Sequence, residues 1–231
     1  FRKVNLSEWA YYFCQGCPLG YSAMGGQTLN PYGRKTFESG GSSSGSGVAV
    51  AANYAVAAIG SETSGSILSP SGKTSVVGLK PTIGAVSRSG VVPISSTLDT
   101  AGPMTKSVVD NAILMNALVG EDPTDSYSFK SKPIFYQGLD TVTLKGKRLG
   151  IFTAFEKDSL MKLSLKKMKA AGAEIIFFDP PEVELQNFRR LLDVDMRSDL
   201  PKYIKNHAAQ DLPFDSVQDV VAFNKKDKIG R

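Results

Sequence analysis

The stretch from Gly40 to Pro70 constrains the fold more than any other part of this 231-residue chain. It reads GGSSSGSGVAVAANYAVAAIGSETSGSILSP, with serine- and glycine-rich clusters at 40–47 and 60–66 and an apolar run, Val48–Ile59, between them. Small residues allow backbone to approach backbone or a ligand closely. A flexible Gly/Ser linker would not contain an apolar core segment. The stretch therefore predicts a short buried helix that brings two serine-bearing loops together, with two purely structural turns as the alternative.

The composition is that of an ordinary globular protein. Hydrophobic residues make up 42% of the chain and charged residues 21%, close to the average for globular domains. No apolar run reaches the length of a transmembrane helix, and we expect a cytoplasmic protein with no membrane partner. The net charge is +5, but acidic residues are interleaved with the basic ones. The basic segment 145–169 is interpreted as the solvated face of a helix, and no nucleic-acid partner is expected.

The two cysteines form a Cys-x-x-Cys pair, Cys14 and Cys17. This spacing suits a redox dithiol or half of a zinc site. A structural zinc site needs about four ligands, and the single histidine, His207, is far away in the sequence. We therefore expect ordinary loop cysteines, with a disulfide as the alternative, and neither a metal nor another cofactor.

The hydrophobic pattern alternates between helix-like and strand-like segments. Apolar residues at helical spacing predict helices, and short apolar runs ended by turn residues predict strands. The expected helices are Lys3–Tyr12, Val48–Ala57, Ser107–Val119, Asp158–Ala171, Glu184–Tyr203 and Phe214–Phe223, and the expected strands are Val76–Leu79, Arg148–Phe152 and Glu174–Phe178. Asp99–Met104 is expected to be a turn. The order of elements predicts the α/β class, with a right-handed parallel crossover near residues 148–178.

The second serine cluster contains a candidate nucleophile. A serine hydroxyl needs a nearby base and hydrogen-bond donors for the developing oxyanion. Ser66 follows Thr63-Ser64-Gly65, so consecutive backbone N–H groups can surround one point in space. His207 lies in a polar stretch and is expected to be a surface residue rather than the base. A serine hydrolase of this kind would need a lysine and a second serine instead.

Three other polar residues are assigned structural roles. Ser44 and Ser46 precede the expected helix and are predicted to cap it. Arg88 is predicted to form a structural ion pair rather than to take part in catalysis.

The residues from Gly40 to Met104 resemble the signature region of the amidase signature family. The likeness runs from about Lys3 to Gly120 and rests on two Gly/Ser clusters at fixed separation, then VVGLKPT, a Ser-Arg turn and LDTAGPM. The forms GGQTLNPYG, SETSGSI and PISSTLDTAGPM are similar to the peptide-amidase-like branch. The resemblance implies a large mixed β-sheet core covered by helices on both faces. It also implies a single amidase-signature domain over residues 1–231 that is incomplete at both ends.

The resemblance also implies a role for each serine. Ser66 matches the nucleophile that forms an acyl-enzyme, and Ser42, 24 positions earlier, matches a bridging serine that follows a cis peptide bond. The backbone amides of Thr63, Ser64, Gly65 and Ser66 match the oxyanion hole. In this mechanism a neutral lysine takes a proton from Ser42, Ser42 takes one from Ser66, and Ser66 attacks the amide carbonyl. Burial must depress the pKa of such a lysine.

The catalytic lysine of the family has no counterpart in this sequence. In the family it lies further upstream of the bridging serine than the 41 residues that precede Ser42 here. Lys3 matches a different, non-catalytic position, and neither Lys35 nor Lys73 is a good candidate. A central fragment of a longer enzyme is the simplest explanation. Omitted flanking segments and a natural truncation without activity are the alternatives.

The implied activity is that of an amidase, which hydrolyses a peptide amide or a small carboxamide through the serine–serine–lysine relay. The alternatives are an amidotransferase A-type subunit that releases ammonia from glutamine and a truncated relative without catalysis. Leu68-Ser69-Pro70 stands where several branches have Arg-x-Pro, which counts against an amidotransferase-type contact with a substrate carboxylate. The expected partner is the amide substrate, with a homodimer as a candidate oligomeric state.

Overall fold

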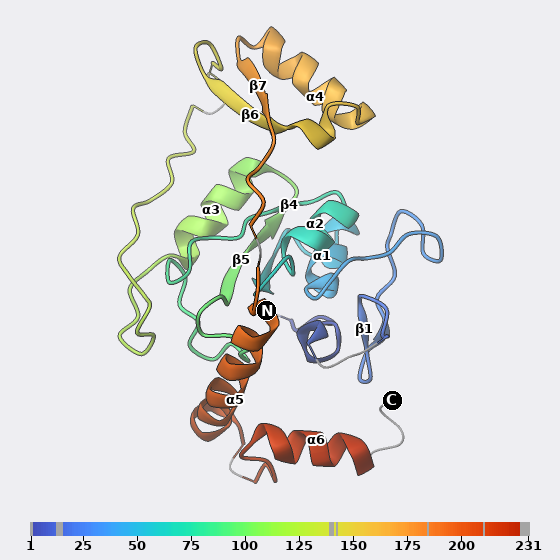
Figure 1. Ribbon diagram of the computed structural model, residues 1–231, viewed down its shortest axis with the longest axis vertical. Coiled ribbons are helices and arrows are strands. Elements are labelled where there is room, and N and C mark those ends of the chain that lie inside the picture. The colour runs from blue at the N-terminus through green and yellow to red at the C-terminus, as the bar shows by residue number, and fades with distance from the viewer. Residues whose placement is uncertain are drawn as a thin grey trace. The chain divides into compact units, whose positions relative to one another are not determined.

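The chain folds into a mixed α/β structure with two compact units (Figure 1). The computed structural model describes residues 2–12, 16–138, 141, 143–183, 185–209 and 211–226. The first unit contains residues 1–135 and 187–231, and the second contains residues 136–186. The α/β class is confirmed, whereas the single domain over residues 1–231 stays a prediction.

A three-stranded antiparallel sheet forms the centre of the first unit. Its order is β3 (Ala57–Glu62), β5 (Thr100–Thr105), β4 (Val77–Gly78), so the last strand in the sequence lies in the middle. β4 falls within the predicted strand Val76–Leu79. A small separate hairpin pairs β1 (Tyr21–Ser22) with β2 (Gly26–Gln27).

The central strand β5 is not predicted by the sequence, and the prediction of a turn at Asp99–Met104 is wrong. All six residues of β5 are buried, although their sequence, TAGPMT, contains few β-formers. Close packing explains the small residues, because a Cβ added at Gly102 would lie 2.2 Å from the Leu79 carbonyl oxygen. The strand is therefore selected by tertiary packing rather than by local propensity.

Helix α1 (Ser44–Ala51) begins earlier and ends earlier than the predicted helix Val48–Ala57. It ends before Asn53, which has a left-handed φ of 62°, and the chain then enters β3. Ser46 does not cap the helix, because it lies inside it and donates from Oγ to the Ile59 carbonyl at 2.8 Å. This bond ties the helix to the neighbouring strand. Ser44 is the first residue of the helix rather than its N-cap, and its hydroxyl donates to Thr28 Oγ1 at 3.4 Å.

Helix α3 (Val108–Leu118) begins where the sequence predicts. Ser107 is its N-cap, with Oγ accepting a hydrogen bond from the Asp110 backbone N–H at 3.1 Å. This arrangement satisfies one of the N–H groups that every helix leaves unpaired at its first turn. α3 packs against β5, and α1 against β3 (Figure 1). A short helix, α2 (Leu68–Lys73), follows β3.

The predicted N-terminal helix Lys3–Tyr12 is wrong. Only a 3₁₀ turn, Glu8–Tyr11, is present, and Trp9 within it has a left-handed φ of 47°. Tertiary contacts override the apolar spacing, because the Asn5 carbonyl accepts a hydrogen bond from the Gly45 N–H at 2.9 Å. The N-terminal segment therefore binds the start of α1 instead of forming its own helix.

Two C-terminal helices complete the first unit: α5 (Phe188–His207) and α6 (Val217–Lys226). Both are displaced from the predicted ranges Glu184–Tyr203 and Phe214–Phe223, and Glu184 itself lies outside the described residues. Their apolar side chains share a buried cluster with the N-terminal segment: Tyr12, Ile94, Leu192, Met196, Leu200 and Val220. α5 therefore carries side chains close to the loops that precede β5.

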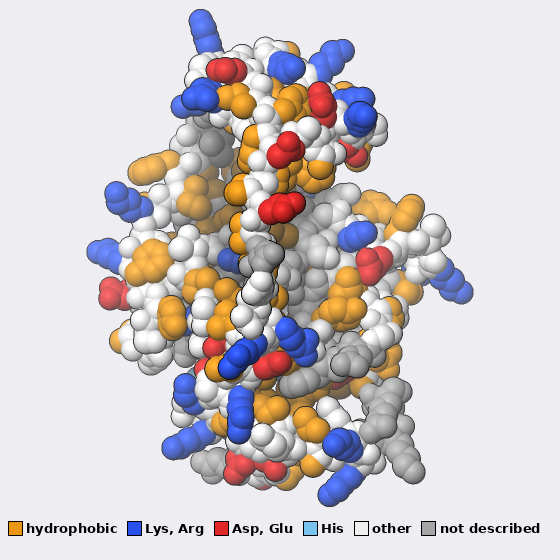
Figure 2. Space-filling model, viewed as in Figure 1, with side chains coloured by type: hydrophobic (Ala, Val, Ile, Leu, Met, Phe, Trp, Pro, Cys, Tyr) orange, Lys and Arg blue, Asp and Glu red, His pale blue; other side chains and the backbone are white. Residues whose placement is uncertain are grey.

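The second unit is a strand–helix–strand unit, as the sequence predicts. β6 (Arg148–Phe152) pairs in parallel with β7 (Glu174–Phe178), and α4 (Ser159–Ala170) connects them. Asp158 caps α4 by accepting a hydrogen bond from the Met161 N–H at 2.7 Å. The four lysines of this helix are exposed, as expected for a solvated face. On the face shown in Figure 2, basic and acidic side chains are interspersed.

Two further findings concern the cysteines and the membrane. Cys17 is disulfide-bonded, which is the alternative that the sequence left open to ordinary loop cysteines. Cys14 lies outside the described residues.

Among the helices of the described ranges, none is both long enough and apolar enough to cross a membrane.

Arg88 forms the structural ion pair that the sequence predicts. Its Nη2 and Nε donate to the two carboxylate oxygens of Asp125 at 2.6 and 2.9 Å, and both side chains are largely buried. The hydrogen bonds from Arg88 are the main reason that the pKa of Asp125 is lowered to about 2.

Replacing Asp125 by asparagine is expected to lower the free energy of unfolding at pH 7 by about 2 kcal/mol, the equivalent of its pKa shift. Because the folded pKa is below the unfolded value of about 3.9, this stability is present above about pH 4 and is lost as the pH falls towards 2. Denaturant unfolding of both proteins at several pH values measures the difference. The control is Glu38→Gln, which removes a half-exposed pair with Lys73 and should change stability by less than about 0.5 kcal/mol. A difference in the free energy of unfolding between the wild type and Asp125→Asn that persists below pH 2 would contradict this account of Asp125.

Candidate active site

The two serine clusters line one cavity of about 330 Å³ in the first unit. Ser42 comes from the first cluster, and Thr63, Ser64, Gly65 and Ser66 come from the second. Apolar side chains complete the wall: Leu19, Ile94 and Leu192, together with Tyr11 and Tyr12. The structure therefore places every site residue predicted from the sequence around the same space.

Ser42 is a buried residue of this cavity. The Gly41–Ser42 peptide bond is cis, as the resemblance predicts for a bridging serine. The Ser42 side chain is 1% exposed, and no described residue forms a hydrogen bond with its Oγ. The Ser42 backbone is held, because its carbonyl accepts from the Ser7 N–H at 2.9 Å. The Ser42 backbone is thus held in place, while its hydroxyl is unpaired among the described residues.

Backbone hydrogen bonds hold the two clusters against each other. The Ser66 carbonyl accepts from the Ser43 N–H at 3.1 Å. The Ser43 hydroxyl in turn donates to the Ser61 carbonyl at 3.1 Å and accepts from the Ser61 N–H at 3.0 Å. Ser43 therefore fixes the distance between the first cluster and the end of β3. Ser43, which directly follows Ser42, contacts the second cluster through both its backbone and its side chain.

A buried carboxylate holds the turn that follows Ser66. Glu62 is 4% exposed, and its Oε2 accepts hydrogen bonds from the backbone N–H groups of Ile67 at 2.7 Å and Leu68 at 3.0 Å. These are the first amides after the nucleophile position. Sequence reasoning did not single out Glu62, although an acidic residue inside an otherwise small and neutral cluster is a visible signal.

A second buried carboxylate holds the start of the same loop. The Thr63 hydroxyl donates to Asp99 Oδ1 at 2.5 Å. The other oxygen, Oδ2, accepts from the backbone N–H groups of Ile94 at 2.8 Å and Ser95 at 2.9 Å. Burial raises the pKa of Asp99, and these hydrogen bonds oppose that shift. Sequence reasoning included Asp99 in the LDTAGPM motif but gave it no role.

One side of the cavity is formed by α5 and the N-terminal segment. Tyr12 donates from its hydroxyl to Asp193, and the guanidinium carbon of Arg189 lies 4.5 Å from the centre of the Tyr12 ring. Burial and the neighbouring Asp193 carboxylate raise the pKa of Tyr12 to about 12. The phenol is therefore a neutral donor at physiological pH and not a candidate base.

None of the described residues that line the serine cavity is a lysine or a histidine. Lys3, Lys35 and Lys73 are exposed, which agrees with the interpretation that none of them is the base. Within the described ranges, histidine, cysteine and carboxylate side chains do not gather in groups of three or more that could hold a metal ion.

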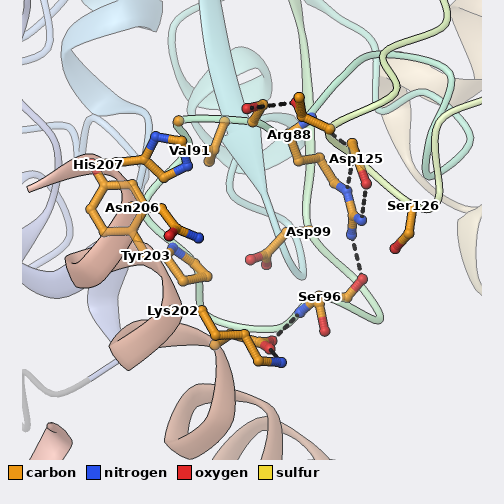
Figure 3. A pocket seen from close by; sticks show the side chains of 15 residues that line it. Arg88, Val91, Ser96, Asp99, Asp125, Ser126, Lys202, Tyr203, Asn206 and His207 are labelled. Carbon is orange, nitrogen blue, oxygen red and sulfur yellow. Dashed lines mark hydrogen bonds and ion pairs between the residues drawn. The ribbon is translucent and has the colours of Figure 1, made fainter. Parts of the chain in front are cut away.

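His207 belongs to a different cavity, of about 220 Å³ (Figure 3). Tyr203, Asn206 and His207 come from α5, and the Arg88–Asp125 pair lies across from them, with Asp99 between. The exposed His207 ring lies 5.3 Å from the Tyr203 ring, measured between centres. The prediction that His207 is not the base of the serine cluster agrees with this position.

Comparison with known proteins decides the family. The family model described as Amidase matches residues 1–231. The chain belongs to the amidase signature family. A probable amidase of Arabidopsis thaliana is 38% identical to this amidase-family chain over 236 aligned positions, which cover 97% of the chain and 45% of the relative. The chain thus spans about half the length of the curated relatives that it matches.

Solved structures show the same relationship. The peptide amidase of Stenotrophomonas maltophilia matches with a TM-score of 0.86 and 39% identity, over 96% of this chain and 47% of that one. The A-type subunit of the glutamyl-tRNA(Gln) amidotransferase of Thermotoga maritima matches with a TM-score of 0.69 and 29% identity, over 96% and 47%. This amidase-family chain is therefore more similar to the peptide amidase than to that amidotransferase, as its sequence motifs predict.

Proposed function

We propose that the full-length protein hydrolyses carboxylic amides through a serine–serine–lysine relay, with Ser66 as nucleophile and Ser42 as bridging serine. The observation that carries this proposal is the Ser42 hydroxyl, which is buried at the serine cavity and has no hydrogen-bond partner among the described residues. A buried hydroxyl without a partner costs about 1–3 kcal/mol. An orphaned group at a cavity is therefore expected to have a functional reason.

In the proposed steps the two serines act together with a lysine. Ser66 Oγ attacks the carbonyl carbon as its proton passes to Ser42 Oγ, and Ser42 passes its own proton to a neutral lysine. The backbone N–H groups of residues 63–66 are candidates to donate hydrogen bonds to the oxyanion. Ser42 then protonates the leaving amine, and water hydrolyses the ester by the reverse transfers. In this proposal the lysine lies outside these 231 residues.

The cavity wall favours an amide whose acyl part is apolar. Tyr12, Leu19, Ile94 and Leu192 line the space beside Ser66, and Arg189 lies at its side. Arg189 is already paired with Asp193 at 3.2 Å, so it is not a dedicated site for a substrate carboxylate. Leu68 also stands where several branches have an arginine. Both features favour a peptide amide or a small carboxamide over glutamine.

The test is ammonia release by the full-length protein from three substrates: a C-terminally amidated dipeptide with apolar side chains, benzamide and glutamine. We expect hydrolysis of the peptide amide or benzamide, with glutamine at least about 10-fold slower in kcat/KM, a difference of about 1.4 kcal/mol in the barrier. Preferential hydrolysis of glutamine would favour the amidotransferase-type alternative. A folded protein that releases ammonia from none of them would contradict the proposal.

A further inference from the structure

The strongest feature outside the proposed relay is the buried carboxylate of Asp99. It is 6% exposed and lines the cavity that contains His207. A small cavity of about 10 Å³ is lined by Asp99 together with Ser42, Thr63 and Ser66. The carboxylate therefore lies next to the reacting groups of the proposed relay, although it does not face the main 330 Å³ space.

Asp99 links Thr63, which follows β3, to the loop that precedes β5. One oxygen accepts from the Thr63 hydroxyl, at the start of the candidate oxyanion loop. The other accepts from two consecutive backbone amides, those of Ile94 and Ser95. All three partners are donors, and a carboxylate is the side chain that can accept on both oxygens at once.

The 94–96 segment is itself anchored to α5. The Ser95 hydroxyl donates to Asp195 Oδ2 at 2.5 Å, and the Ser96 N–H donates to Asp199 Oδ2 at 2.8 Å. Through Asp99, Thr63 is therefore connected to the 94–96 segment, which the 20-residue helix α5 holds in place. The candidate oxyanion loop, residues 63–66, is thus held by a contact outside β3, the strand that precedes it.

We propose that Asp99 is a positioning residue, whose carboxylate holds Thr63 so that the amides of residues 63–66 converge on the substrate carbonyl oxygen. This inference rests on the proposed amidase function. Oxyanion stabilisation depends on donors that are already oriented before the reaction. A displacement of about 1 Å in such a group can lower the rate about 100-fold.

The test is a set of Thr63 variants in the full-length protein. Thr63→Val keeps the shape of the side chain and removes the hydroxyl, and it leaves the Ile94 and Ser95 contacts of Asp99 in place. We expect kcat to fall about 10- to 100-fold with KM changed less than about twofold, because the defect concerns the transition state. Thr63→Ser restores the hydroxyl and should return kcat to within about threefold of the wild type.

Three further variants separate positioning from general destabilisation. Asp99→Ala removes the acceptor of the Thr63 hydroxyl together with that of the Ile94 and Ser95 amides, so it should lower kcat at least as much as Thr63→Val. The double variant should be no worse than Asp99→Ala, because that single variant already lacks the Thr63 contact. Asp125→Asn is the matched control, since it changes another buried carboxylate of the same unit that contacts Arg88 rather than Thr63. It should lower the melting temperature and leave kcat within about twofold.

An active wild type whose Thr63→Val variant keeps full kcat would overturn this inference alone. So would an equal loss of kcat in Asp125→Asn, because the effect would then follow stability rather than the Thr63 contact. A folded wild type without amidase activity would contradict the proposed function, and this inference with it.

Discussion

Replacing Ser66 by alanine in the full-length protein is expected to lower the kcat for amide hydrolysis by at least about 10³-fold. The reason is that loss of a serine nucleophile leaves only the catalysis that binding and the oxyanion donors provide. The fold should be unaffected, because Ser66 is hydrogen-bonded to the first cluster through its backbone carbonyl. The measurement is the steady-state rate of ammonia release, together with the melting temperature.

The control for Ser66 is Ser126→Ala. Ser126 is an exposed serine beside the second cavity, and its replacement should leave both kcat and the melting temperature unchanged. An active Ser66→Ala variant would show that the protein uses another nucleophile, and the assignment of the second serine cluster would then be wrong.

Replacing Gly40 by alanine is expected to destabilise the fold by about 4 kcal/mol or more and to abolish activity. Gly40 has a left-handed φ of 68°, a conformation that costs an L-residue about 1–2 kcal/mol. A Cβ at this position would also lie 2.7 Å from the Pro70 Cα and 2.8 Å from the Pro70 nitrogen. Backbone cannot move aside as a flexible side chain can, so the two serine clusters would be pushed apart. Denaturant unfolding and the amidase assay measure the two effects.

Gly90→Ala separates these two causes. Gly90 has a similar φ of 78°, but a Cβ there would meet no atom within 4 Å. Its replacement should therefore lower the free energy of unfolding only by the cost of the left-handed backbone conformation, about 1–2 kcal/mol. Activity should be retained. Equal losses of stability in Gly40→Ala and Gly90→Ala would mean that the close contact between Gly40 and Pro70 does not contribute to the destabilisation.

The sequence predicts those elements that carry their own local signals. The second unit follows its hydrophobic pattern, with β6 and β7 at the predicted bounds. The N-cap at Ser107 is likewise visible from the residues around it. The serine clusters are recognisable because small polar residues flanking an apolar segment are unusual in a linker.

The remaining elements depend on contacts between distant segments, which local patterns do not report. Strand β5 consists mostly of small residues with few β-formers, and it becomes a strand only because it is buried between its neighbours. The N-terminal helix fails to form because Asn5 pairs with the start of α1. Glu62 and Asp99 accept backbone amides, and nothing in the sequence marks which amides a carboxylate will meet. The contacts of these two carboxylates are the part of the candidate site that only the structure reveals.

The most direct test of the central claim is covalent labelling of the full-length protein with a fluorophosphonate, followed by peptide mass spectrometry. Such a probe phosphonylates a serine that is activated as a nucleophile beside an oxyanion hole. We expect one adduct per chain, on the peptide that contains Ser66, and no adduct in the Ser66→Ala variant. A wild-type protein that hydrolyses amides but is labelled on another residue would contradict the serine relay proposed for Ser42 and Ser66.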